Sequence, residues 1–322
     1  MSASFKRIDY SLRPAKHAER RMLCDVFRRL RPFGRVEEYV YVGFGSVWFS
    51  DFILFHRSLG IKNMVSIEQA ETARERIEDN KPFRIPVDYR ASKDALPDLY
   101  WSRNQFIWLD YDDPLSAEML LDMRSVARRA GSGSVLAVSV QCMKAPQVAE
   151  AETDTLLGAP SALDRFVAVF GRERVPQETA ADQLYGWQFG ALSRDMILQE
   201  ILAELAARNS DGLEAEMLFQ PICSFEYEDG AKMTTIIGIF YSSSDQEKLE
   251  QCHFEALDFL PDPPRPVRIT VPKLTAREFK KLESQLPLAE GGNLELGTIP
   301  QKEARQFAEM YRYLPNFAVL EG

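Results

Sequence analysis

The sequence predicts an α/β protein, with a doubly wound, mostly parallel sheet, an antiparallel strand pair at its end and a small, mainly helical C-terminal tail. Strand-like apolar runs and helix-compatible segments alternate about five times between residues 38 and 140, which is typical of a parallel sheet with helices on both faces. The first run breaks into the turn Gly43-Phe44-Gly45. Two later apolar runs flank Glu228-Asp229-Gly230, which predicts a hairpin.

An amphipathic helix is predicted over 15–30, ahead of the sheet, and Pro32 and Gly34 end it. Its apolar positions recur at intervals of three and four residues and are Met22, Leu23, Val26, Phe27 and Leu30. The intervening positions carry arginine and glutamate. This pattern indicates a helix that packs one face on the body of the protein.

Five buried strands should follow, at 38–42, 62–67, 85–89, 105–109 and 134–140. The segments between them predict helices at 51–59, 71–80 and 115–130. Gly60 closes the first of these helices as a C-terminal cap, and Lys81-Pro82 ends the second. The second strand ends in Glu68, about where a parallel βαβ unit places the tip of its next strand.

The rest of the chain is less regular. Helices are expected within 156–170 and over 192–207, and the hairpin strands over 216–227 and 233–241. A proline-rich linker over 260–266 precedes two helix-like segments, at 274–286 and 301–313. These boundaries predict a basic N-terminal helical segment or lid at 1–35, a main domain at 36–245 with an insertion at about 141–190, and a linker with a small C-terminal subdomain at 246–322.

The composition predicts a soluble globular protein. The 322 residues are 45% hydrophobic, no apolar run approaches the roughly 20 residues of a membrane span, and no apolar signal core follows Met1. We therefore expect a cytoplasmic protein with no membrane partner. Cys24, Cys142, Cys223 and Cys252 are far apart and only three histidines are present, so neither zinc nor a disulfide framework is indicated and buried free thiols are expected.

The charge is unevenly distributed along the chain. The net charge is −9, but residues 1–35 carry ten basic and three acidic side chains, a net charge of +7. The basic residues are Lys6, Arg7, Arg13, Lys16, Arg20, Arg21, Arg28, Arg29, Arg31 and Arg35. Two interpretations are open: a solvated helix face that balances an acidic body, or a docking edge for an anionic substrate.

The turn at Gly43 and Gly45 predicts a ligand site, because a strand that ends in glycines before a helix lets backbone amides approach a ligand closely. A dinucleotide site needs a third glycine, in the pattern G-x-G-x-x-G. Trp48 occupies that position. A nicotinamide-dependent oxidoreductase is therefore disfavoured.

Over residues 36–242 the strand pattern, the terminal hairpin and the acid at Glu68 resemble the class I, Rossmann-like, S-adenosylmethionine-dependent methyltransferases. The resemblance implies that the loop Gly43-Phe44-Gly45-Ser46 lies against the methionine part of S-adenosylmethionine and that Glu68 accepts hydrogen bonds from both ribose hydroxyls. It implies an adenine contact at Ala91, Ser92 and Lys93. It also allows Arg13 or Lys16 to bind the cofactor carboxylate from an N-terminal lid.

The segment Asp110-Tyr111-Asp112-Asp113-Pro114 follows the fourth strand, where the resemblance places the methyl-acceptor chemistry. Asp110, Tyr111, Asp112 and Asp113 are the candidate catalytic residues, and Asp110 is also a candidate cofactor contact. Three carboxylates so close together repel one another, and desolvation would raise the pKa of at least one. They could orient and deprotonate an amine or hydroxyl nucleophile. A magnesium site and a helix N-cap remain open alternatives.

For other candidate residues, a structural role is an alternative to a functional one. Glu68 could stabilise the N-terminus of the next helix, and His56 is expected to be a packed or surface histidine. Trp48 and Phe49 are expected in the core, although one could wall the cofactor pocket. The aromatic cluster of Tyr185, Trp187 and Phe189 fits an acceptor pocket and a core equally well.

The sequence therefore leaves two functions open. The first is a methyltransferase that uses S-adenosylmethionine to methylate oxygen or nitrogen of a small molecule or nucleic acid. Its acceptor would lie between the 110–114 loop, the 141–190 insertion and the basic N-terminal helix. The second is a methyltransferase-like, non-catalytic binding or scaffold subunit of a larger bacterial system, paired with a protein partner or with itself.

Overall fold

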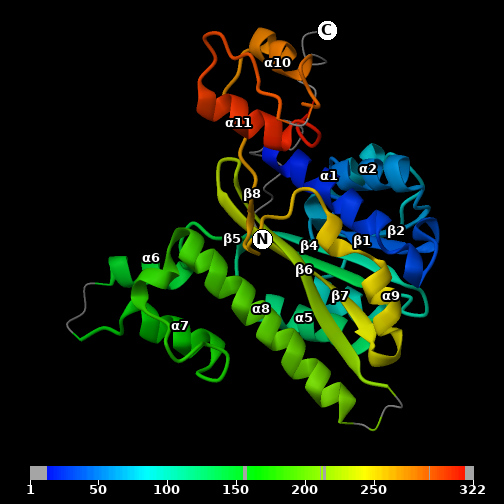
Figure 1. The fold of residues 1–322 in the computed structure, drawn as a ribbon. Coiled ribbons are helices and arrows are strands. Elements are labelled where there is room, and N and C mark those ends of the chain that lie inside the picture. The colour runs from blue at the N-terminus through cyan, green and yellow to red at the C-terminus, as the bar shows by residue number, and fades with distance from the viewer. Residues whose placement is uncertain (1–12, 155–157, 211, 213–214, 290, 316–322) are drawn as a thin grey trace.

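The computed structural model describes residues 13–154, 158–210, 212, 215–289 and 291–315. Its centre is an eight-stranded sheet in the order β3-β2-β1-β4-β5-β7-β6-β8 (Figure 1). The strands are β1 (Val40–Gly43), β2 (Asn63–Ile67), β3 (Val87–Asp88), β4 (Gln105–Pro114), β5 (Val135–Gln141), β6 (Met217–Glu228), β7 (Lys232–Ser242) and β8 (Val267–Arg268). Strands β1 to β5 are mutually parallel, and β7 is antiparallel to both β5 and β6. The predicted fold class is confirmed.

Helices follow the strands as expected in most places, whereas those at 92–95, 146–153 and 246–251 were not predicted. The helices are α1 (Pro14–Arg28), α2 (Ser50–Leu59), α3 (Arg74–Asn80), α4 (Ser92–Ala95), α5 (Ala117–Arg129), α6 (Pro146–Thr153), α7 (Ala162–Phe170), α8 (Gly186–Asn209), α9 (Gln246–Gln251), α10 (Ala276–Glu283) and α11 (Gln301–Met310). Gly60 caps α2 as predicted, with φ of 72° and its N–H on the carbonyl of His56.

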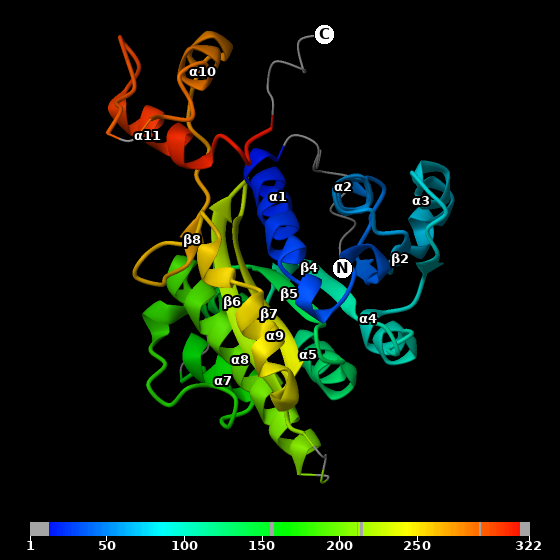
Figure 2. The same ribbon diagram turned by 45° about the vertical axis from the view of Figure 1, so that its right-hand side comes forward.

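Two hydrophobic clusters cover the two faces of the sheet. Helices α1, α2 and α3 pack on one face together with residues of the C-terminal segment, and α5, α7 and α8 pack on the other. Figure 2 shows α1 and α9 in front of the sheet and α8 behind it. The amphipathic pattern of α1 is confirmed, because its predicted apolar positions are all buried. This helix is therefore part of the core that positions the sheet edge.

Strand β4 differs from the prediction, since it runs to Pro114 and includes the acidic segment that we expected as a loop after the strand. Asp110 still pairs with Ser139 of β5, and Pro114 pairs with Gln141 across a bulge. The polar side chains are tolerated because they lie at the end of the strand, where a bulge can redirect them. The acids are thus held by sheet pairing.

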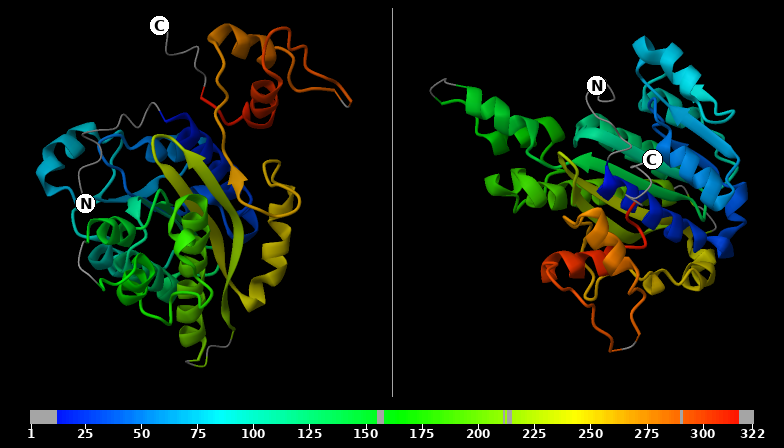
Figure 3. Two further views of the ribbon diagram at one scale, coloured as in Figure 1. Left: turned by 90° about the vertical axis from the view of Figure 1, so that its left-hand side faces the viewer. Right: turned by 90° about the horizontal axis from the view of Figure 1, so that it is seen from above.

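Helix α8 also differs, because it begins at Gly186 and takes in Trp187 and Phe189 of the aromatic cluster that we expected ahead of it, with Tyr185 as its N-cap. Phe189, Leu192 and Met196 are buried at intervals of three and four residues, so the apolar period of the helix already includes the cluster. Figure 3 shows this long helix beside the β6–β7 hairpin. The tight turn of that hairpin is confirmed, with Gly230 at φ of 85°.

The C-terminal segment adds a strand that was not predicted. Strand β8 lies just after the proline-rich linker and pairs parallel to β6 through Phe225 and Glu226. It is only two residues long, too short for a period-two pattern to reveal it. Helices α10 and α11 follow and stand beyond the end of the sheet (Figure 1). Across the described ranges, no helix combines the length and apolar character needed to cross a membrane.

Candidate active site

The carboxyl ends of β1, β2 and β4 meet at one edge of the sheet. Gly43 of β1 pairs with Ser66 of β2 on one side and with Trp108 of β4 on the other. Glu68 and Asp110 each follow their paired residue by two positions. The edge therefore gathers the glycine turn, the acid after β2 and the acids of β4, in a place where parallel sheets bind ligands.

Glu68 is joined directly to the glycine turn. Its Oε2 accepts the N–H of Ser46 at 3.1 Å, and its Oε1 accepts the N–H of Ala70 at 3.3 Å. Burial raises the pKa of Glu68, backbone N–H groups oppose that rise, and the negative charge of Asp112 adds to it. The structure thus brings Glu68, Ser46 and Asp112 together at one site, from three separate elements.

The two glycines make room for side chains of the protein itself. A Cβ on Gly43 would lie 2.4 Å from the hydroxyl oxygen of Tyr41, and a Cβ on Gly45 would lie 2.4 Å from the ring of Phe49. Neither distance is compatible with normal packing. Phe49 itself has a φ of 46°, in the left-handed region. Glycine is therefore required by the packing beneath the turn, whatever lies above it.

Lys16 is buried and anchors the first acid of β4. Its Nζ lies 2.6 Å from Oδ1 of Asp110 and 2.8 Å from Oε2 of Glu19, and 4.2 Å from the centre of the Trp108 ring. The backbone N–H of Lys16 donates to Oδ2 of Asp229 at 2.9 Å, so the β6–β7 turn caps helix α1. Helix α1 is tied to the site by a side-chain contact and a backbone contact.

Two further acids, Glu19 and Asp51, were not predicted from the sequence. Glu19 accepts a hydrogen bond from the hydroxyl of Thr235, and Asp51 accepts one from the hydroxyl of Tyr41. Burial raises the pKa of Asp51, and the positive charge of Arg20 opposes the rise. The one available signal was the three-residue spacing of Lys16 and Glu19, which places an ion pair on one helix face.

Tyr111 and Ser92 face the opposite side of the sheet from Lys16. The hydroxyl of Tyr111 donates to Oδ2 of Asp122 at 2.7 Å, and the hydroxyl of Ser92 donates to the same oxygen at 2.5 Å. The ring of Tyr111 packs edge-on against Phe44 of the glycine turn, with ring centres 5.3 Å apart. Asp122 thus joins β4 to α4, while Lys93 and Asp113 lie exposed.

The remaining candidates from the sequence lie in contacts that belong to the packing of the protein. Nδ1 of His56 lies 2.7 Å from the carbonyl of Ile61, and its ring packs on Phe83. Phe49 is fully buried, as expected for a core residue, and Phe189 of the aromatic cluster is fully buried as well. Three of the four cysteines are buried free thiols, and Cys223 is partly buried.

Part of the basic charge of the N-terminal segment is matched by the protein. Lys16 pairs as described, Arg28 pairs with Asp25 at 2.5 Å, and Arg35 lies 3.2 Å from both Glu37 and Glu38. The side chain of Arg29 donates to the carbonyl of Ala256. Lys6 and Arg7 lie outside the described residues.

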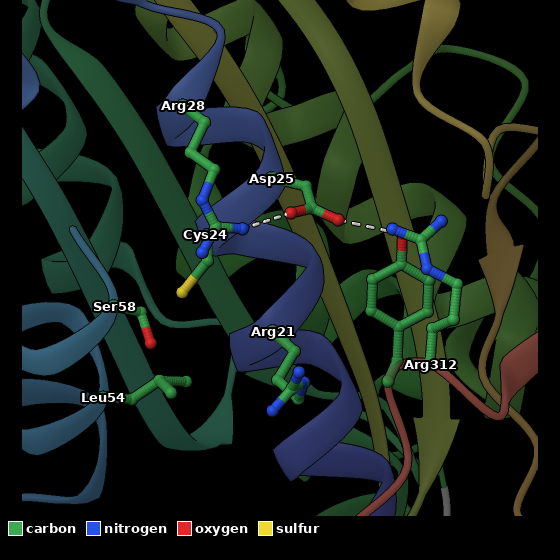
Figure 4. A pocket seen from close by; sticks show the side chains of 8 residues that line it. Arg21, Cys24, Asp25, Arg28, Leu54, Ser58 and Arg312 are labelled. Carbon is green, nitrogen blue, oxygen red and sulfur yellow. Dashed lines mark hydrogen bonds and ion pairs between the residues drawn. The ribbon is translucent and has the colours of Figure 1, made fainter.

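A surface pocket of about 120 Å³ lies away from this edge, on the outer side of α1 (Figure 4). Its lining comes from α1, α2 and the C-terminal segment and comprises Arg21, Cys24, Asp25, Arg28, Leu54, Ser58, Arg312 and Tyr313. Within this lining, Asp25 accepts hydrogen bonds from Arg28 and from the hydroxyl of Tyr313. The pocket therefore marks where the C-terminal segment docks on α1.

Metal-binding groups are not assembled in the part of the chain that the structure describes: no three histidine, cysteine, aspartate or glutamate side chains there could share one ion. Two acids of this edge, Asp110 and Glu68, instead bind donor groups of the protein itself. Lys16 pairs with Asp110, and backbone N–H groups bind Glu68.

Several solved structures are remotely similar to this chain. Trm1 from Pyrococcus horikoshii, solved with S-adenosyl-L-methionine, is 12% identical with a TM-score of 0.45, over 73% of this chain and 58% of that chain. CalS10, an amino pentose methyltransferase from Micromonospora echinaspora, is 14% identical with a TM-score of 0.32, over 39% of this chain. DesVI from Streptomyces venezuelae is 15% identical with a TM-score of 0.29, over the same share. The match spans 51% of the length of CalS10 and of DesVI.

No curated protein matches the chain. A family described as "Putative O-methyltransferase" matches residues 8–322, which includes the N-terminal helix, the sheet and the C-terminal segment. The match agrees with the methyltransferase resemblance predicted from the glycine turn, Glu68 and the terminal hairpin. The protein therefore belongs to this O-methyltransferase family.

Proposed function

We propose that this protein transfers a methyl group from S-adenosylmethionine to an oxygen atom of a small acceptor molecule. The observation that carries the proposal is the contact between Glu68 and the glycine turn, at the same sheet edge as Asp110 and Asp112. Membership of the O-methyltransferase family supports the type of reaction.

The residues at the edge fit S-adenosylmethionine. Each oxygen of the Glu68 carboxylate accepts one backbone N–H, and a carboxylate oxygen can accept two hydrogen bonds. The carboxylate therefore keeps acceptor capacity for a ribose hydroxyl. Residues Gly43 to Ser46 would lie along the methionine part, Ser92 and Lys93 would approach the adenine, and Arg13 would face the carboxylate.

The cofactor supplies an electrophilic methyl group on a sulfonium ion, and the side chains of the chain provide orientation and proton removal. Lys16 occupies Oδ1 of Asp110, which leaves Oδ2 to accept a hydrogen bond from the acceptor hydroxyl. Such a bond orients a lone pair of the acceptor oxygen toward the methyl group. Positioning of the reacting groups is a large part of catalysis. Asp112 is the candidate base for the hydroxyl proton. The hydrogen bond from the hydroxyl of Tyr111 to Asp122 ties β4 to helix α5.

A small acceptor is favoured over nucleic acid. Binding of nucleic acid depends on basic groups that are available to neutralise phosphates. In α1, Lys16 and Arg28 are engaged with carboxylates of the protein, and Arg29, directly after the helix, donates to a carbonyl. We propose that the acceptor lies between Asp110–Pro114, the 141–190 insertion and the first turn of α1.

The proposal is tested by transfer of a tritiated methyl group from S-adenosylmethionine to a panel of small hydroxylated molecules, with tRNA in a parallel reaction. Asp112→Asn should lower kcat by about 100-fold, the lower range for loss of a general base, while the Kd for S-adenosylmethionine changes less than about threefold. Asp94→Asn, which removes an exposed acid of α4, is the matched control and should leave both constants unchanged.

Two results would contradict this account. Bound S-adenosylmethionine with no methyl transfer to any acceptor, together with a copurifying partner, would favour a non-catalytic binding subunit. Transfer to tRNA that falls steeply with added salt would identify a nucleic-acid acceptor instead.

A further inference from the structure

In the part of the chain that the structure describes, Arg20 of α1 is a buried cation with no hydrogen-bond or ion-pair partner. The residue is only 7% exposed, and its Nε is buried without an acceptor. Lys16, which is buried in the same helix, contacts two carboxylates. A buried guanidinium without an anion is unfavourable, because it loses water and gains no compensating contact. The surroundings of Arg20 therefore indicate a missing anionic group.

Arg20 is directed toward the sheet edge of the candidate active site. It lies one helical turn after Lys16, on the same side of α1. Side chains of a helix lean toward its N-terminus, and the first turn of α1 lies at the edge, where Lys16 contacts Asp110. Helix α2 lies beside α1 (Figures 1 and 2), with the rings of Phe27 and Phe55 packed edge-on. Arg20 thus approaches the edge between these two helices.

The acid on which Arg20 acts is Asp51, in the first turn of α2. Burial raises the pKa of Asp51, and the positive charge of Arg20 opposes this rise more strongly than the hydrogen bond from Tyr41 does. Oδ2 of Asp51 accepts that hydrogen bond, and the same oxygen would lie 3.2 Å from a Cβ on Gly43. Asp51 is therefore held at the glycine turn, and the two buried charges are near each other without an ion pair.

Two opposite charges held apart match an α-amino acid, which carries a carboxylate and an ammonium group on one carbon. Such a group can lie between Arg20 and Asp51 and give each a charge-assisted contact. The methionine part of S-adenosylmethionine ends in this group. Lys16 is engaged with Glu19 and Asp110, so it is not available for a further carboxylate.

We propose that Arg20 binds the carboxylate of the methionine part of S-adenosylmethionine, with the ammonium group on the same carbon directed to Asp51. The inference rests on the proposed function. It adds a contact from a buried arginine to the one that Arg13 would make from the start of α1. The product S-adenosylhomocysteine keeps the same amino-acid end and is bound through the same contact.

The experiment measures the Kd of three ligands for the full chain by calorimetry at neutral pH. The ligands are S-adenosylmethionine, decarboxylated S-adenosylmethionine and 5′-methylthioadenosine, which lacks the whole amino-acid end. Wild type should bind the decarboxylated ligand about 10- to 100-fold more weakly than S-adenosylmethionine, the loss expected for hydrogen bonds to a charged group. Arg20→Met should weaken S-adenosylmethionine by a similar factor and leave the other two ligands within about twofold of wild type.

The controls separate the carboxylate contact from a loss of structure. Arg20→Lys keeps the charge and should retain part of the preference for the carboxylate, whereas Arg21→Met removes the exposed neighbour and should change no affinity. Arg13→Met, measured in parallel, should reduce the preference less than Arg20→Met. The thermal midpoint of ligand-free Arg20→Met should not fall, because the guanidinium makes no ion pair within the described chain.

Three results would overturn the inference. They are equal binding of S-adenosylmethionine and its decarboxylated form by wild type, an equal loss for all three ligands in Arg20→Met, and a carboxylate preference that Arg13→Met removes but Arg20→Met keeps. Failure of the wild type to bind S-adenosylmethionine would refute the proposed function and this inference with it. Binding without a carboxylate preference would refute this inference alone.

Discussion

Nζ of Lys16 lies 2.6 Å from Oδ1 of Asp110, and both groups belong to the edge of the sheet where β1, β2 and β4 end. The same ammonium group binds Glu19, which is fully buried. One lysine of the first helix therefore compensates two carboxylates, one in the core and one at the candidate active site. This contact links α1 to the end of β4.

Replacing Lys16 by methionine should destabilise the protein by about 3 kcal/mol, because removal of one partner leaves a buried carboxylate without compensation. Urea unfolding gives the change in free energy. The double variant Lys16→Met/Glu19→Gln should recover part of the loss, since it removes the buried charge as well. Lys62→Met, at an exposed site, is the control. A Lys16→Met protein as stable as wild type would contradict the role of this contact.

Gly45→Ala should destabilise the protein by about 1–3 kcal/mol, the usual cost of overpacking. The added Cβ would lie 2.4 Å from the ring of Phe49 and 2.7 Å from the Ser66 hydroxyl. Gly131→Ala is the matched control, because a Cβ there meets no atom within 4 Å. Thermal unfolding of both variants tests the difference. Equal midpoints would show that the turn relaxes freely and that packing does not require Gly45.

His17 should make the protein less stable in acid. Burial, with the positive charges of Arg21 and Arg20, lowers the pKa of His17 to about 4 from the usual 6.5. The unfolded chain therefore binds a proton between pH 6.5 and 4 that the folded chain does not, so stability is lost as pH falls through this range. His17→Gln should flatten the decline in unfolding free energy, whereas substitution of the exposed His253 should not. Parallel curves for wild type and His17→Gln would be inconsistent with this reasoning.

Affinity for S-adenosylmethionine should increase as pH rises through the raised pKa of Glu68, above its ordinary value of 4.5. The ionised carboxylate accepts hydrogen bonds from hydroxyl groups at both oxygens, whereas the protonated form loses one acceptor. Titrations from pH 4.5 to 8 should show this rise in the wild type and a flat profile in Glu68→Gln. Identical profiles would show that another group controls the pH dependence.

The sequence was most informative where one local rule decides the structure. The apolar spacing predicts α1, Gly60 marks the end of α2, and Asp229-Gly230 marks the hairpin, because each depends on residues close together in the chain. The candidate edge could be predicted for the same reason, since parallel strands must present their ends together.

The contacts that span the chain could not be predicted in this way. Lys16 meets Asp110 across 94 residues, and Thr235 meets Glu19 across 216 residues. No local pattern encodes which polar groups pair inside a core. The same limit explains why α8 was expected to start later than Gly186 and why the acids of β4 were expected in a loop: packing against the sheet extends both elements.

The most direct test of the central claim is a calorimetric titration of the protein with S-adenosylmethionine at neutral pH. Glu68→Gln should weaken binding by about 10- to 100-fold, the loss expected for hydrogen bonds to a charged group, and Glu71→Gln, three residues further on at an exposed site, should bind like the wild type. Failure of the wild type to bind at high micromolar concentration, or equal binding by Glu68→Gln, would contradict the account.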